Sequence, residues 1–255
     1  MSVISSNYNK VVNFNTCFGN IVNKVPQISI MFDTDNQMLN RYALIKEEIK
    51  ELNQAIDDNN MVEVVDALMD ILYVTYGMMS YIGINGNIIF DMLDNSNSTN
   101  YEKVSKLTIS GKVFDELSTQ LNINPYFSNS VDVINYTNEF LISSIRDNNF
   151  TLMVSYLVSL IYYTYEASFF LGVCADDTFD LVHNNNMSKL CSSEDEAKLT
   201  VEYYLKNDHL GYESPYYEIA PDPLYYVVKN KSTKKILKSI NWKNVDLSSY
   251  LTGKS

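Results

Sequence analysis

The hydrophobic and polar positions of the chain predict a protein built mainly of helices. Between about Gln37 and Ile56, apolar side chains recur every three or four residues, as they do on one face of a helix. A second segment, from about Met61 to Ile82, is apolar nearly all round, which predicts a buried helix ended by Gly83. The polar residues 57–60 separate the two segments. A break this short lets the helices fold back as an antiparallel hairpin.

Both segments carry carboxylates at helical spacing: Glu47, Glu48 and Glu51 on the first, and Glu63, Asp66 and Asp70 on the second. Spacings of three and four residues put each set near one face of its helix, so the hairpin could bring five or six carboxylates together. For Glu47 and Glu51 alone, a simpler interpretation is a solvated face on which Lys46 and Lys50 are their helical partners.

The acids of the second segment need a different explanation. Apolar residues surround Glu63 and Asp66, so we expect these two side chains to be buried. Buried carboxylates without a partner repel one another and are costly. A divalent cation removes that cost, and Mg²⁺ prefers carboxylate oxygens. The second helix therefore favours a metal site over a solvated face.

These residues resemble a known signature. The pattern Glu47-Glu48-x-x-Glu51, a spacer, then Glu63-x-x-Asp66 is similar to that of the all-α nucleoside triphosphate pyrophosphohydrolase superfamily. The superfamily includes the MazG-like, dimeric dUTPase and phosphoribosyl-ATP pyrophosphohydrolase families. Residues 66–74 (DALMDILYV) and 183–190 (HNNNMSKL) resemble the phosphoribosyl-ATP pyrophosphohydrolase-like branch, which typically ends in an SNMSKL-like string. Asn15, after Phe14, stands where the family often has His.

The resemblance implies an enzyme that uses Mg²⁺, or alternatively Mn²⁺, to cleave a nucleoside triphosphate between its α and β phosphates. The implied metal ligands and catalytic residues are Glu47, Glu48, Glu51, Glu63 and Asp66, with Glu47 either binding a further metal or acting as general base, and Asp70 supporting the ligands from outside the coordination sphere. The implied contacts to the substrate phosphate are Lys189, Asn186 and Ser188. For Lys189, the alternative is a solvated side chain favoured by a helix C-terminus.

The pattern of the first hairpin returns later in the chain. Residues 73–76 (YVTY) recur as 162–165 (YYTY), residues 58–60 as 147–149, and Gly83 as Gly172, each at an offset of 89 (162 − 73, 147 − 58, 172 − 83). A constant offset predicts an internal duplication. Adding 89 to the six acidic positions gives Tyr136, Thr137, Phe140, Leu152, Ser155 and Ser159. Because single-copy members of the resembling families pair as dimers, the chain is expected to be a fused dimer with one surviving site.

We therefore expect an all-α fold, a helical bundle made of two tandem repeats (a pseudo-dimer) with a small C-terminal β-hairpin. The expected parts are residues 1–96, the N-terminal segment and acidic repeat; 97–124, a connection with a helix at 112–121; 125–190, the degenerate repeat; and 191–255, a C-terminal extension. A shorter helix at 88–93 is also expected. Whether such pseudo-dimers pair further, as a homo-oligomer, is left open.

The extension has its own signals. Ser193 and Glu196 are spaced as a capping box for a helix that runs to about Lys206. Residues 225–228 and 235–240 flank a lysine-rich turn and read as the two strands of a hairpin. Its lysines could lean over a bound phosphate or simply keep an edge strand soluble. Of the nearby aromatic residues, Tyr203, Tyr204, Tyr212 and Trp242, each is expected to pack in the core rather than to stack on a base.

Charge and composition narrow the class of partner. Lys+Arg 19 against Asp+Glu 31 gives a net charge of −12, which argues against nucleic-acid binding. It does not argue against a nucleotide, because a bound metal reverses the local sign. The three cysteines form no CxxC and are expected to be reduced thiols of a cytoplasmic protein. No signal peptide is expected, because Met1 to Lys10 lacks an apolar core.

Residues 152–175 are apolar enough to suggest a membrane span, but the repeat makes them a bundle helix that has lost its acids. We expect no membrane association.

Two functions compete with the enzyme. A binding or regulatory protein would hold metal and nucleotide without turnover, and a structural bundle would do neither. Replacing Glu48 with Gln separates them: it should abolish hydrolysis in an enzyme, only weaken Mg²⁺ binding in a regulator, and stabilise the fold of a scaffold. The base is not specified by the sequence; dUTP or dCTP house-cleaning, a modified nucleotide and phosphoribosyl-ATP all fit.

Overall fold

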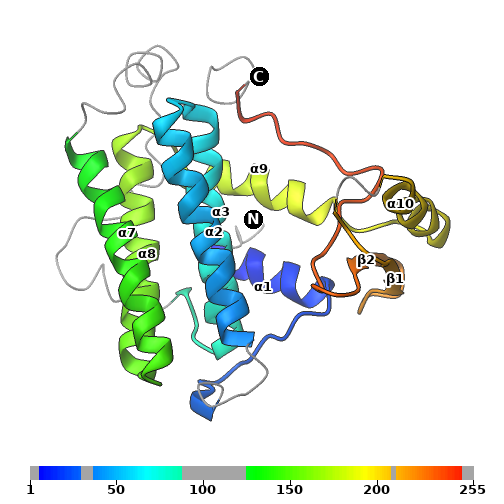
Figure 1. Ribbon diagram of the computed structural model, residues 1–255, viewed down its shortest axis with the longest axis horizontal. Helices are drawn as coiled ribbons and strands as arrows, with labels where there is room; N and C mark the ends of the chain where they lie inside the picture. The colour runs from blue at the N-terminus through cyan, green and yellow to red at the C-terminus, as the bar shows by residue number, and fades with distance from the viewer. Residues whose placement is uncertain (1–5, 30–36, 88–124, 208–210, 249–255) are drawn as a thin grey trace, which may run out of the picture. The chain divides into compact units, whose positions relative to one another are not determined.

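The computed structural model describes residues 6–29, 37–87, 125–207 and 211–248 (Figure 1). These contain seven α-helices and one two-stranded antiparallel sheet: α1 (Asn7–Cys17), α2 (Gln37–Asp57), α3 (Met61–Ile82), α7 (Pro125–Arg146), α8 (Phe150–Phe170), α9 (Ala175–Met187), α10 (Glu194–Lys206), β1 (Pro215–Ile219) and β2 (Tyr226–Asn230). The predicted helical class with a small C-terminal hairpin is confirmed. The helices expected at 88–93 and 112–121, and the connection 97–124, lie outside the described residues.

The chain forms two compact units. Unit 1 is made of Met1–Val11, Val22–Asp180 and Asp246–Ser255, and unit 2 of Val12–Ile21 and Leu181–Val245. Unit 2 thus combines part of α1 with the C-terminal region, a grouping that the sequence did not suggest. The four-part division drawn from the sequence stays a prediction.

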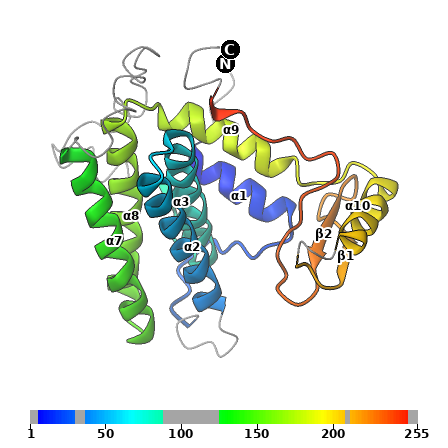
Figure 2. The same cartoon turned by 45° about the horizontal axis from the view of Figure 1, so that its top comes forward.

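Four helices of unit 1 lie side by side: α2, α3, α7 and α8 (Figures 1 and 2). Helix α3 supplies most of the core, because 17 of its 22 residues are buried. Helix α2 adds a single buried stripe that includes Ile45, Ile49 and Leu52. Burying one such aliphatic side chain stabilises the fold by about 1.5–3 kcal/mol. Because α3 buries many more side chains than α2, it contributes more of the bundle's stability. The predicted bounds of both helices agree with the structure to within one residue.

The two helical hairpins of unit 1 share their turn geometry. Asn59 and Asn148, 89 residues apart, both have positive φ, 51° and 53°. The next residue in each turn caps the following helix: the Asn60 side chain accepts from the Glu63 amide, and the Asn149 side chain from the Leu152 amide.

The matching positions also meet in space. The hydroxyl oxygens of Tyr76 and Tyr165, again 89 apart, lie 3.3 Å from each other in the core. Gly83 and Gly172 both adopt left-handed backbone after their helices, with φ of 76° and 73°. These agreements support the hypothesis of an internal duplication.

In unit 2, α10 begins close to the predicted position. The Ser193 hydroxyl accepts from the Glu196 amide at 3.2 Å, as a cap should. The Glu196 carboxylate, however, accepts from the backbone and hydroxyl of Ser192 at 2.9 and 2.8 Å, one residue earlier than a capping box requires. It also accepts from the Ser239 hydroxyl, so Glu196 ties the start of α10 to the end of the chain's lysine-rich segment.

The predicted hairpin has the wrong second strand. Strand β2 pairs with β1, from Pro215 opposite Asn230 to Ile219 opposite Tyr226, and not with residues 235–240. The chain does turn at the lysine-rich segment, where Lys234 has a positive φ of 58°. The residues after this turn do not form a strand, however; they pair with β2 only through an isolated β-bridge between Lys229 and Ile236. The prediction chose the wrong partner because apolar segments lie both before and after the YVV run of β2, and the sequence pattern does not tell which of them pairs with it.

In the described parts of the chain, no single helix is long and apolar enough to cross a bilayer. Only α8 and α9 taken together, as a bent pair, have the length and composition of a span.

The end of α3 provides the first prediction. A Cβ at Gly83 would lie 1.9 Å from the Val25 carbonyl oxygen, whereas a Cβ at Gly211, with nearly the same φ, would have no atom within 4 Å. Left-handed backbone alone costs a non-glycine residue about 1–2 kcal/mol. Gly83→Ala should therefore lower the free energy of unfolding by at least about 1 kcal/mol more than Gly211→Ala, because backbone must move. Urea denaturation of both variants measures the difference, and equal losses would contradict the close approach.

Candidate active site

The register of the α2–α3 hairpin decides which acids face one another. The turn centres near Asn59, so residues equally far from it along the two helices lie at the same level. Glu48 is eleven residues before Asn59 and Asp70 eleven after it; Glu51 and Asp66 are eight before and seven after. Two levels of the hairpin thus carry an acid on each helix.

Glu48 lies on the inner stripe of α2. It follows Ile45 by three residues and precedes Leu52 by four, and both of these side chains are fully buried. Helical spacing therefore turns the Glu48 side chain toward α3 and half-buries it. Glu47 and Glu51 lie on the outer side of the same helix and are exposed.

The electrostatics show that the carboxylates converge on Glu48. Burial, and then the charges of Asp70, Glu51, Glu47 and Asp66 in that order, raise the pKa of Glu48 to about 8. Five of the six acids that the sequence analysis named therefore act on one another electrostatically, and their role as metal ligands stays a prediction. Asp70 has the largest effect of the four, although the family resemblance implied only a supporting role for it.

The expectation that Glu63 is buried was wrong. Glu63 is exposed, and Asp66 and Asp70 are half-buried. The physical reason is position: Glu63 lies in the first turn of α3, level with Ala55 and next to the solvated hairpin turn, whereas Asp66 and Asp70 lie deeper along the same face. Glu63 is also not among the groups that raise the pKa of Glu48.

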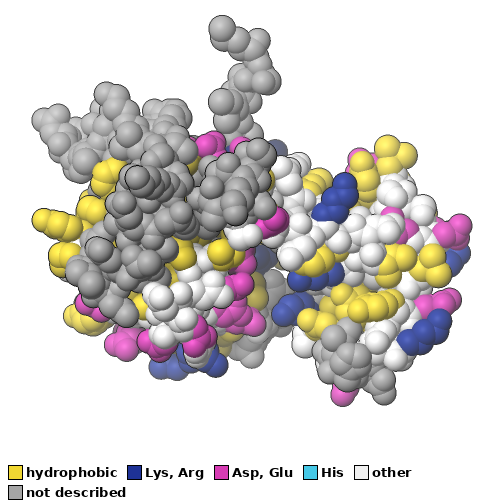
Figure 3. Space-filling model, turned by 90° about the horizontal axis from the view of Figure 1, so that it is seen from above, with side chains coloured by type: hydrophobic (Ala, Val, Ile, Leu, Met, Phe, Trp, Pro, Cys, Tyr) yellow, Lys and Arg dark blue, Asp and Glu magenta, His cyan; other side chains and the backbone are white. Residues whose placement is uncertain are grey.

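Several acidic side chains are visible on the face of the molecule that Figure 3 shows. In the described parts of the chain, no three His, Cys, Asp or Glu side chains are already arranged to hold a metal ion. The chemistry of the group nevertheless fits a hard cation, because the donors are all carboxylate oxygens and the raised pKa of Glu48 records their mutual repulsion. Mg²⁺ keeps several of its waters and takes few protein ligands, so it does not need a closed cage.

The second hairpin carries no such group. At the positions equivalent to Glu47 and Glu51, the rings of Tyr136 and Phe140 lie 4.5 Å apart, and the Phe140 ring is 5.8 Å from that of Tyr156 on α8. An aromatic cluster thus stands where the first hairpin has its acids.

The expected phosphate contacts lie in unit 2. The Lys189 ammonium donates to the Asn186 side-chain oxygen Oδ1 at 2.5 Å, so the structure brings these two side chains together. Ser188 is used locally: its hydroxyl donates to the Asn185 carbonyl and accepts from the Lys243 amide, at 2.7 and 3.1 Å. A phosphate role for these residues stays a prediction.

Asn15, at the family's His position, is buried and accepts from the Asn20 side chain at 3.0 Å, which fixes the turn after α1.

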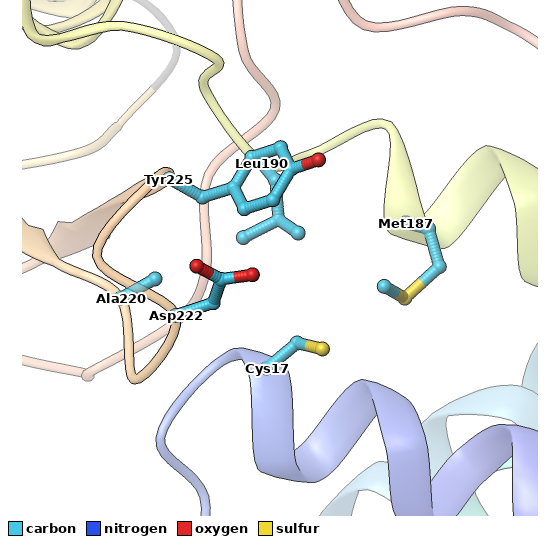
Figure 4. Close-up of a pocket in the computed structure, with 6 residues that line it drawn as sticks. All are labelled: Cys17, Met187, Leu190, Ala220, Asp222 and Tyr225. Atoms are coloured by element: carbon cyan, nitrogen blue, oxygen red, sulfur yellow. The ribbon is translucent and has the colours of Figure 1, made fainter.

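Sequence reasoning missed a cavity in unit 2. It is lined by Cys17, Met187, Leu190, Ala220, Asp222 and Tyr225, and its volume is about 250 Å³ (Figure 4). The residues come from the end of α1, the end of α9 and the loop between β1 and β2. The only sequence signal was a proline on each side of Asp222, which marks a fixed turn.

The fold and the site define an all-α protein with a carboxylate cluster on a helical hairpin. Comparison with known proteins agrees. The sequence profile of the phosphoribosyl-ATP pyrophosphohydrolase family matches residues 11–97, which contain both helices of that hairpin. L479, an uncharacterized protein of Acanthamoeba polyphaga mimivirus, is 36% identical over 250 residues, which cover 97% of this chain and 96% of that protein. No solved structure gives a significant match.

Residues 11–97 form a domain of the phosphoribosyl-ATP pyrophosphohydrolase family, part of the MazG-like nucleoside triphosphate pyrophosphohydrolase superfamily. The resemblance drawn from the acidic motif is thereby confirmed. The family is one of hydrolases that act on phosphoric anhydrides, so membership also supports the expectation of an enzyme. Pyrophosphohydrolases of the MazG-like type typically use divalent metals.

The pKa of Glu48 predicts how stability varies with pH. Its folded value of about 8 exceeds the ordinary value of 4.5, so the folded state binds the extra proton between these limits. Without metal, stability should be highest below the lower limit and fall as pH rises through the upper one. Mg²⁺ should restore it most at the upper end, because it competes with the proton for the carboxylates.

Thermal denaturation in EDTA and in Mg²⁺ across this range measures the effect. Glu48→Gln should flatten the pH dependence in EDTA, whereas Glu139→Gln, an exposed acid on α7, should leave it unchanged. A Gln variant that melts with the same pH profile as the parent would show that Glu48 is not the titrating group.

Proposed function

We propose that this protein is a Mg²⁺-dependent nucleoside triphosphate pyrophosphohydrolase that cleaves the α–β phosphate bond. Water would add to a phosphorus of that linkage, the bridging P–O bond would break, and the products would be a nucleoside monophosphate, pyrophosphate and one proton. A dUTPase- or dCTPase-like house-cleaning role is one form of this activity. The observation that carries the proposal is the convergence of four carboxylates on half-buried Glu48, in the segment that matches the family.

The chain's own residues divide the work. Glu48, Glu51 and Asp66 would bind Mg²⁺ together with Asp70. Of the neighbouring carboxylates, Asp70 raises the pKa of Glu48 most. Glu47 is exposed at the rim, where it could reach solvent and accept the proton from the attacking water. Glu63, solvated at the first turn of α3, would join only as an outer ligand. Bound Mg²⁺ would orient the phosphates, lower the pKa of that water and neutralise developing charge.

We also infer that the active hairpin and the α7–α8 hairpin are the two halves of an internal duplication. Support comes from the offset of 89 in the turns, the caps and the Tyr76–Tyr165 pair. The second half has replaced acids by aromatic side chains, so one chain would hold one site.

A binding protein without turnover is the alternative. It would use the same carboxylates to hold metal and nucleotide. The absence of these acids from the α7–α8 hairpin favours this alternative, because it suggests that the chain has already lost one catalytic site.

The test of the proposal is pyrophosphate release from a panel of canonical and modified nucleoside and deoxynucleoside triphosphates, in Mg²⁺ and in EDTA. Release should require Mg²⁺, and Glu48→Gln should reduce kcat/KM by at least about 100-fold, because a metal ligand is lost. Glu139→Gln, which removes the same charge from an exposed position on α7, should retain activity.

Folded protein that binds Mg²⁺ and nucleotide but releases no pyrophosphate from any member of the panel would overturn the enzyme and leave the binding protein.

Lys189 can be tested by how it affects the two kinetic constants. If its ammonium contacts a substrate phosphate, Lys189→Ala should raise KM by about tenfold, the size of one charge-assisted hydrogen bond. Lys198→Ala is the matched control, since Lys198 forms an ion pair with Glu194 on the exposed side of α10. A lower melting temperature with unchanged KM would show instead that the Lys189–Asn186 hydrogen bond is structural.

A further inference from the structure

The face of the α2–α3 hairpin that carries the carboxylates also carries a basic residue. The hairpin, residues 37–82, contains three basic residues, Arg41, Lys46 and Lys50. Lys46 and Lys50 lie two residues before and after Glu48, so helical spacing puts both on the opposite side of α2, where they are exposed. Arg41 lies seven residues before Glu48, which is two helical turns and therefore the same face.

Arg41 packs against the end of α3. It lies eighteen residues before Asn59 in the turn, and Gly77 lies eighteen after it (59 − 41 and 77 − 59), so both are at one level of the hairpin. Tyr81 follows Gly77 by one turn, and its side chain leans back toward that level. The guanidinium carbon of Arg41 lies 5.3 Å from the centre of the Tyr81 ring, a distance at which a cation is attracted to an aromatic face.

The position of Tyr81 is fixed by the segment that follows α1. The Asn23 side chain donates to the Tyr81 carbonyl oxygen, and the Asn23 amide donates to the Ser80 carbonyl oxygen at 2.9 Å. The Tyr81 side chain is buried. It therefore gives Arg41 a fixed surface, from which the planar guanidinium can present its N–H donors to a ligand.

No carboxylate in the described part of the chain forms an ion pair with Arg41. Arg41 starts about 10 Å from Glu48 along the axis of α2, and it is not among the groups that shift the pKa of Glu48. Burial lowers the pKa of Arg41, and Tyr81 opposes that change, but a guanidinium keeps its proton. A half-buried cation without an anionic partner favours the binding of an anion.

The remaining charges of the hairpin set the direction in which a bound polyphosphate would extend. Between the carboxylates and Arg41, this face carries exposed Leu44, which brings no charge. Toward the turn, Asp57, Asp58 and Glu63 are all exposed and add negative charge, which repels phosphate. A chain of phosphates held at the carboxylates should therefore extend toward Arg41.

We propose that Arg41 binds the terminal phosphate of a nucleoside triphosphate and so makes a triphosphate a better substrate than a diphosphate. That the ligand is a nucleotide rests on the proposed function. The guanidinium fork offers two parallel N–H groups to two phosphate oxygens, a strong and directional contact. A nucleoside diphosphate contains the same α–β linkage but lacks the phosphate that Arg41 would hold.

The test compares each triphosphate of the nucleotide panel with the diphosphate of the same nucleoside, in Mg²⁺. Arg41→Gln should lower kcat/KM for the triphosphates by at least about tenfold, mainly through a higher KM, because a charge-assisted contact is lost. Its kcat/KM for the diphosphates should stay within about twofold of the parent's. Lys46→Gln, which removes a positive charge from the other side of the same helix, should change neither value.

A second variant separates binding from packing. Arg41→Met keeps a long apolar side chain against Tyr81 and removes the charge, so it should give the same result and replaces Arg41→Gln if that variant does not fold. If Arg41 only packs on Tyr81, both variants would melt at a lower temperature with the parent's ratio of triphosphate to diphosphate activity, and the proposal would be wrong. A parent that does not distinguish the two nucleotides would overturn it as well.

Binding of the same nucleotides is measured separately by calorimetry with Ca²⁺, a hard cation that carboxylates also bind. Arg41→Gln should weaken the binding of triphosphates about tenfold and leave that of diphosphates unchanged. This binding preference without pyrophosphate release would overturn the proposed function alone. Pyrophosphate release with an unchanged triphosphate preference in Arg41→Gln would overturn the role of Arg41 alone.

Discussion

Mutual repulsion among carboxylates is the constraint on which the active hairpin depends. Glu48 is held at the edge of an apolar core beside half-buried Asp66 and Asp70, and desolvation and the neighbouring charges both raise the pKa of Glu48. The apolar packing of α3, most of whose residues are buried, stabilises the hairpin against this repulsion. The hairpin therefore favours the binding of positive charge. A divalent cation would offset the repulsion among the carboxylates while they remain ionised.

Helix periods predicted the bounds of α2 and α3 because both signals are long and locally consistent. The burial of Glu63 was mispredicted because helical periodicity reports the face of a residue but not its depth along the helix. Glu63 shares a face with Asp66 but lies in the solvated first turn of α3. The pairing of β2 failed because strand partners are chosen by tertiary contact. The apolar run at 226–228 could pair with the segment before it or the segment after it, and in the structure it pairs with β1.

The cavity of unit 2 lay beyond sequence reasoning for a related reason. Its lining comes from segments around Cys17, Met187 and Asp222, which are far apart in the chain, and none of these residues belongs to a motif with a fixed spacing. By contrast, the acidic cluster comes from one hairpin, where spacing alone sets the geometry. What a sequence reveals about a site thus depends on how locally the site is built.

One of the contacts between the two hairpins is a polar contact inside the core. Tyr76 and Tyr165 face each other, and the Asn7 side chain donates to the Tyr165 oxygen and to Asp176, each at 2.8 Å. Burial raises the pKa of both tyrosines, so they stay neutral and serve as hydrogen-bonding groups. Because a buried polar group costs stability when its partner is lost, this contact fixes one relative arrangement of the hairpins. The residues that make this contact between the two hairpins are thus different from the carboxylates that gather around Glu48.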